Sequence, residues 1–186
     1  MANVFERAKD AVIGVVKGAG DIVNAVRSTV TEIVVSTLKE AGEITGTALN
    51  VVTEAVRGAM RGTKEVGAET TESARAIVSG AVEAVSQVGG DVIMGSRNAV
   101  RGAIQGAVEV GGDVATAAVA AVEGAVETAG KVGQDVMAVG KAAIETAVET
   151  AGNVAAGSVD AVKKGLRSTA AVPREVVESA LGKDES

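Results

Sequence analysis

The chain has 186 residues, of which 47% are apolar, and carries a formal net charge of −6. This acidic balance disfavours nucleic acid as a partner. The sequence contains no Cys and no His, so thiolate chemistry, the usual general base and the commonest metal ligand are all excluded. Most apolar residues are Ala and Val, and Phe5 is the only aromatic residue. Such side chains bury little area each, which predicts an elongated object held together by many small contacts.

The N-terminal residues 1–10 lack the apolar core of a signal peptide. The charge-free stretches of the chain also fall short of the roughly 18–20 residues that a membrane span requires. The sequence therefore predicts a cytoplasmic location, with attachment to the periphery of a membrane or granule as the alternative.

From Val4 to about Leu166 the sequence repeats with a period of 22 residues. Segments 88–109, 110–131 and 132–153 align without gaps. Each unit is two eleven-residue halves, and eleven residues make three helical turns at about 3.67 residues per turn. The first and thirteenth positions of the unit form an apolar stripe, which we expect to pack against other helices: Val56, Val66, Val78, Val88, Val100, Val110, Val122, Val132 and Ile144.

The repeat never slips in phase, whereas loops between packed helices usually shift it. This favours one very long helix, on the order of 250 Å at 1.5 Å per residue. Hairpins whose turns preserve the register are the alternative. The predicted fold is thus all-α, with a very long hendecad-repeat amphipathic helix, or helices, packed in a straight to right-handed bundle or filament.

The 24 glycines each cost about 1 kcal/mol inside a helix relative to Ala, so the isolated helix is marginal. The fifteenth position of the repeat is always small and reads Gly14, Gly58, Gly80, Gly102 and Gly124 in five units. Small residues let two helix backbones approach closely. We predict that these glycines and the neighbouring stripe form the helix-packing interface.

Pro173 is the only proline and predicts a break in the helical region. We divide the chain into a 22-residue-repeat helical region, 1–172, and a terminal part, 173–186. The terminal part should hold a short helix, Pro173 to Leu181, and a charged tail.

No constellation of residues predicts catalysis. Asp91, Asp113 and Asp135 recur every 22 residues and would lie about 33 Å apart along one helix, too far to chelate one ion; we interpret them as solvated. The Gly-Gly-Asp at 89–91 matches no phosphate-binding loop. No His, Cys or Tyr organises a nucleophile and base. We expect no enzyme activity, no cofactor, no metal and no small-molecule substrate.

Segments 124–131 (GAVETAGK) and 147–153 (AVETAGN) carry a resemblance in period and composition. They resemble the eleven-residue amphipathic repeats of synucleins, perilipins and group 3 late-embryogenesis-abundant proteins. The resemblance implies a helix that forms on a surface or by association.

Three functions remain open. The first is a non-enzymatic, self-associating structural protein whose partner is itself, a homo-oligomer. The second is an amphipathic coat of a membrane, lipid droplet or storage granule, similar to perilipins or phasins. The third is a desiccation or stress protectant. The glycine positions and the mixed-sign polar face favour the first, because a lipid coat would use bulkier anchors such as Leu, Phe or Trp.

Overall fold

The computed structural model describes residues 3–18 and 20–184. Within these ranges the chain folds into nine α-helices and one short 3-10 helix, with no strand. The helices are α1 (Val4–Val16), α2 (Ile22–Ala41), α3 (Asn50–Glu65), α4 (Thr70–Gln87), α5 (Val92–Glu109), α6 (Val114–Lys131), α7 (Val136–Val154), η1 (Ala156–Ser158), α8 (Val159–Ser168) and α9 (Arg174–Leu181).

The prediction of one very long helix is wrong, and the alternative of register-preserving hairpins is correct for most of the chain. Helices α4, α5 and α6 are each 18 residues long. The 22-residue repeat is therefore one helix and one four-residue turn. Eighteen residues make about five helical turns, and the connection takes up about as many residues as a sixth turn. The apolar pattern consequently continues in phase although the chain reverses direction.

The three turns between α4 and α7 are built from a left-handed glycine followed by a helix-capping aspartate. Gly89 and Gly111 have φ of 70° and 68°, a conformation that costs residues with a Cβ but not glycine. The N–H of Gly112 then donates to the carbonyl of Ala107 at 2.7 Å, which closes the end of α5. Asp113 accepts a hydrogen bond from the backbone N–H of Thr116 at 2.6 Å and starts α6.

Asp91 and Asp135 start α5 and α7 in the same way. The interpretation of these three aspartates as merely solvated therefore missed their role. Their period of 22 residues marks the beginnings of α5, α6 and α7.

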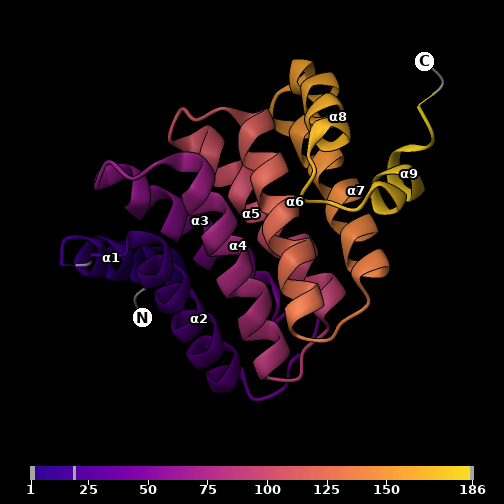
Figure 1. Cartoon of the computed structure of the whole chain (residues 1–186). Coiled ribbons are helices and arrows are strands. Elements are labelled where there is room, and N and C mark those ends of the chain that lie inside the picture. Colours follow the sequence, from indigo (N-terminus) through magenta and orange to yellow (C-terminus); the bar gives the residue numbers. More distant parts are fainter. Residues whose placement is uncertain (1–2, 19, 185–186) are drawn as a thin grey trace.

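The helices lie in two layers. Odd-numbered helices α1, α3, α5 and α7 contact one another in sequence, as do α2, α4, α6 and α8, while consecutive helices contact across the layers. Neighbours within one layer run parallel, because two reversals separate them. Figure 1 shows this progression from indigo α1 to yellow α9, with the two termini at opposite ends of the array. Helix α9 closes the odd layer against α7.

One continuous core of Val, Ala, Ile and Leu runs between the layers. Ile77, Ile104 and Ile144 are among its largest fully buried side chains, and many alanines are completely buried beside them. Full burial of one Val or Ile contributes about 1.5–3 kcal/mol. The small residues compensate for their modest area by bringing helix backbones close together.

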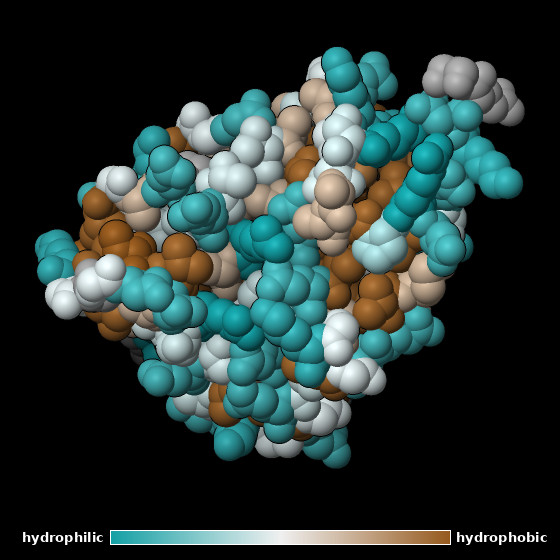
Figure 2. All heavy atoms as spheres, viewed as in Figure 1, coloured by the Kyte–Doolittle hydropathy of each residue, from teal (hydrophilic) through white to brown (hydrophobic). Residues whose placement is uncertain are grey.

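The visible surface in Figure 2 is mostly hydrophilic, with apolar residues gathered over α1 at the left of the view and again around α6 and α7 at the right. Among the described residues, no helix is long and apolar enough to cross a membrane.

Candidate interaction surfaces

Four of the five glycines at the fifteenth repeat position lie against the backbone of the preceding helix in the same layer. A Cβ added at Gly80 would meet the carbonyl oxygen of Arg27 in α2 at 2.4 Å. The equivalent contact of Gly102 is with Thr53 at 2.7 Å, and that of Gly124 is with Arg75 at 2.6 Å. A Cβ added at Gly58 would come still closer to the carbonyl oxygen of Phe5 in α1. These distances leave no room for a side chain, so glycine sets the spacing within each layer.

The remaining residues of the predicted interface divide into three groups. Gly14 in α1, the first helix described in its layer, has no neighbouring atom within 4 Å of an added Cβ. The thirteenth-position residues are fully buried: Val56, Val78, Val100, Val122 and Ile144. The first-position residues lie in the turns after the helices and are only half-buried: Val66, Val88, Val110 and Val132. The turns thus separate residues that a continuous helix would have placed on one stripe.

Arginine–glutamate pairs join helices of the same layer, and sequence reasoning did not find them. Arg27 in α2 pairs with Glu83 in α4 at 2.6 Å, and Arg75 in α4 pairs with Glu127 in α6 at 2.6 Å. In the odd layer, Arg57 pairs with Glu109, and Arg97 pairs with Glu145. The partners are 48–56 residues apart in the sequence, slightly more than two repeat units. This recurring spacing of Arg and Glu is the sequence feature from which the pairs could have been predicted.

The arginine–glutamate pairs are partly exposed. Each contributes about 0.2–1 kcal/mol. Hydrogen bonds from Lys131 and Arg75 lower the pKa of Glu127. The pairs help to fix the register of neighbouring helices more than they stabilise the fold.

Three hollows follow one another across the layer of even-numbered helices. The first, about 510 Å³, lies between α2 and α4 and is lined by residues such as Ser28, Glu32 and Gln87. The second, about 260 Å³, shares Asn24 and Arg27 with the first and extends to Glu127 of α6. The third, about 450 Å³, lies among the start of α4, α6 and α8, and its walls include Ala115, Val119 and Ala161. We call these three hollows together the even-layer face.

The even-layer face changes character along its length. The two hollows near α2 are lined mainly by charged and hydroxyl side chains. The hollow beside α8 is lined mainly by Ala, Val and Gly, with Glu123 and Lys164 among its lining residues. Helix α8 has only 10 residues, so it covers α6 less completely than α6 covers α4.

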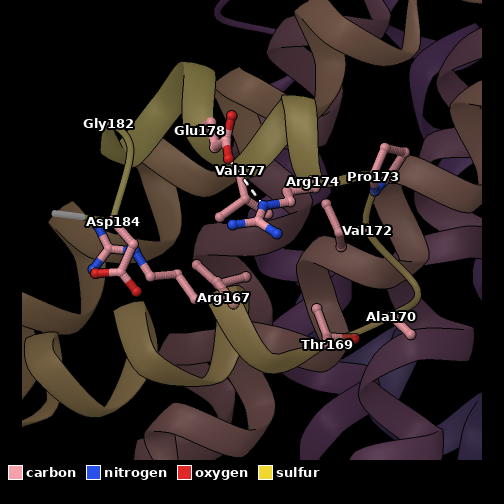
Figure 3. A pocket seen from close by; sticks show the side chains of 11 residues that line it. Arg167, Thr169, Ala170, Val172, Pro173, Arg174, Val177, Glu178, Gly182 and Asp184 are labelled. Atoms are coloured by element: carbon pink, nitrogen blue, oxygen red, sulfur yellow. Dashed lines mark hydrogen bonds and ion pairs between the residues drawn. The ribbon is translucent and has the colours of Figure 1, made fainter. Parts of the chain in front are cut away.

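Another hollow of about 390 Å³ lies between α8 and α9 and is drawn in Figure 3. Its two arginines are matched by two carboxylates: Arg174 pairs with Glu178 at 2.9 Å, and Arg167 pairs with Asp184 at 3.9 Å. Because the charges balance, this hollow has no chemistry that selects an anion. Within residues 3–18 and 20–184, no three Asp or Glu side chains gather as a metal site would require.

Two layers of antiparallel helices, a regular helix-and-turn unit and contacts between neighbouring units define an α-helical repeat protein. The chain is similar to the crystal structure of a de novo designed helical repeat protein, with 21% sequence identity and a TM-score of 0.50. The similarity covers 95% of this chain and 94% of the designed one, and it concerns the fold. No family model and no curated protein matches the chain. The resemblance to synucleins, perilipins and late-embryogenesis-abundant proteins is therefore not supported by a family match.

Proposed function

We propose that this chain is a non-enzymatic scaffold that holds an extended polypeptide along the even-layer face. The observation that carries the proposal is the succession of three hollows across α2, α4, α6 and α8. Stacked helical repeats create long surfaces of this kind, and proteins of the class use them to bind partners.

The burial of the repeat's own apolar stripe supports a scaffold more than a coat or a filament. The Val and Ala face that motivated those hypotheses lies between the helices of a single chain. The chain has therefore already buried the surface that a lipid droplet or a bundle of other chains would have covered. Surface coating and protection during desiccation remain alternative proposals without a structural feature in their favour.

The lining residues indicate what the bound segment should look like. At the α8 end, Val119 and Ala161 suit one or two apolar side chains. At the α2 end, Arg27 and Arg75 are paired with glutamates, while the carboxylates of Glu32 and Glu72 line the hollows without an ion pair among the described residues. We therefore expect a segment that is apolar at one end and carries Lys or Arg at the other.

The proposal is tested by selecting binders from a random peptide library displayed against the full chain. Selected peptides are then titrated against two face variants, Ala161→Glu and Ser28→Lys, and one control, Val108→Glu. Ala161 and Ser28 are exposed residues of the even-layer face, whereas Val108 is 39% exposed on α5 in the odd layer.

We expect the two face variants to weaken peptide binding roughly tenfold or more, because each places a charge or a longer side chain in the hollow. The control variant should bind as the parent does. Peptides that respond only to Val108→Glu would contradict the proposal, as would a library that yields no peptide binding below millimolar concentration.

A further inference from the structure

The two ends of the helical array differ, and the N-terminal end leaves one face uncovered. From α3 to α6, the fifteenth-position glycine lies against the preceding helix of its layer, whereas Gly14 of α1 faces open space. At the other end, Val176 of α9 covers Gly140 of α7, because a Cβ there would meet its side chain at 2.4 Å. Terminal repeats of such arrays usually present a polar outer face.

The uncovered face is instead partly apolar. Val15 and Ile22 are each 39% exposed, and they are two of the seven large apolar residues exposed in the described chain. Of the other five, Val23 lines the second hollow of the even-layer face, and four are distributed over α5 and α7. Figure 2 shows the apolar surface over α1 at the left of the molecule. We call Gly14, Val15, Gly18 and Ile22 the N-terminal face.

The charges around this face differ from those inside the even layer. Position 18 of the repeat holds Glu83 in α4 and Glu127 in α6, and each receives an arginine from the preceding helix of its layer. In α1 and α2 the same position holds Lys17 and Lys39.

The same charges complement each other when two N-terminal faces meet. Asp10 lies four residues before Gly14, and Lys17 lies three residues after it, so all three lie near one side of α1. If two α1 helices cross antiparallel with Gly14 at the two-fold axis, Asp10 of each copy comes opposite Lys17 of the other. Both residues are exposed, and the Asp10 side chain has 72% of its surface free although Lys9 of the same helix lies 3.7 Å from it. A two-fold interface requires this kind of self-complementarity.

We propose that the N-terminal face is the contact surface of a homodimer, in which two copies of this chain pack α1 against α1 in antiparallel orientation. Within the chain, a similar glycine-mediated backbone approach joins the parallel neighbours α1 and α3, and α2 and α4; the dimer contact would use it in antiparallel orientation. It leaves the even-layer face out of the contact, so the dimer would carry two binding surfaces.

The test is a charge exchange measured by sedimentation velocity over a wide range of protein concentrations. Asp10→Lys gives a chain with two basic residues in the contact, and Lys17→Asp gives a chain with two acidic ones. Each variant alone should dimerise roughly tenfold or more weakly than the parent, since two attractions become two repulsions. An equimolar mixture of the two variants should form heterodimers, and the double variant should dimerise as the parent does.

Lys141→Asp, on α7 at the far side of the array, is the matched control and should leave dimerisation unchanged. Circular dichroism of every variant checks that it folds, and the rescue by mixing excludes misfolding as the cause of lost dimers. The proposal is overturned if the parent stays monomeric up to millimolar concentration, or if the dimer ignores both charge changes. It is equally overturned if the parent stays monomeric but binds neutral phospholipid vesicles in a way that Val15→Glu abolishes, because a lipid surface would then be the occupant.

Discussion

Replacing Gly124 with alanine should destabilise the fold, although alanine is the better helix former. Gly124 lies in the middle of α6, and an added Cβ would lie 2.6 Å from the carbonyl oxygen of Arg75, whereas ordinary contact begins at 3.4 Å. Helices α4 and α6 would have to separate locally by about the difference, 0.8 Å. The opposing atom is backbone, so no side chain can rotate out of the way.

The magnitude follows from two opposing effects. Overpacking of this kind costs about 1–3 kcal/mol, and the gain in helix propensity is up to about 1 kcal/mol. The expected net loss for Gly124→Ala is therefore about 1 kcal/mol. Gly130→Ala in the same helix is the control, because its nearest neighbour, Val136 Cγ2, lies at an ordinary 3.7 Å and the residue is exposed. That variant should gain up to about 1 kcal/mol.

The two variants should thus differ by about 2 kcal/mol, or about 4–8 °C in melting temperature for a chain of this size. Urea unfolding followed by circular dichroism at 222 nm measures the difference, and an unchanged denaturant slope shows that the variants share one unfolding reaction. If Gly124→Ala is as stabilising as Gly130→Ala, the close approach of α4 and α6 is not present in solution.

Three further predictions concern the turns and the ion pairs. Asp113→Ala removes the cap of α6 and should lower the free energy of unfolding by about 1 kcal/mol. Hydrogen bonds from the side chain and backbone of Thr116 lower the pKa of Asp113 in the folded protein. The stability that the ionised Asp113 contributes is therefore complete above the unfolded pKa of about 3.9 and is lost as the pH falls through the lower pKa of the folded state. Asp113→Asn should keep most of the cap but lose this acid dependence in urea titrations at pH 2–5. Equal pH profiles of stability for the Asn variant and the parent would show that the charge of the Asp113 carboxylate does not stabilise the fold. Gly111→Val should cost at least about 1 kcal/mol because φ is 68° there, while Gly111→Asn should cost less; equal melting temperatures for both would show that the left-handed turn does not persist. Arg75→Ala should cost no more than about 1 kcal/mol in low salt, and the loss should shrink in 1 M NaCl; a larger, salt-independent loss would mean that the side chain stabilises by packing.

Helical content, the 22-residue unit and the close approach at the glycines could be predicted from the sequence, while the course of the chain could not. The reason lies in residues such as Gly111 and Asp113. A left-handed glycine followed by an N-cap aspartate is a signal for the end of one helix and the start of the next. The apolar period obscured it, because a four-residue turn advances the pattern about as far as one helical turn does.

The surfaces were less predictable than the helices. Which face of α4 meets α2 depends on the reversal of the chain, so the pairing of Arg27 with Glu83 could not be derived from a straight helix. The even-layer face depends on the shortness of α8, which begins after the 3-10 segment Ala156–Ser158. That segment departs from the regular turn, and no glycine–aspartate signal announces it in the sequence.

The division of each unit into one helix and one turn constrains how such a chain can change in length. An internal duplication of 22 residues would add one helix and move every later helix into the opposite layer, which would exchange the surfaces on either side of the array. A duplication of 44 residues would add one helix to each layer and leave all later helices with their original neighbours. Genes for proteins of this design should therefore lengthen or shorten most readily in steps of 44 codons, and the partner-binding surface would grow with each step.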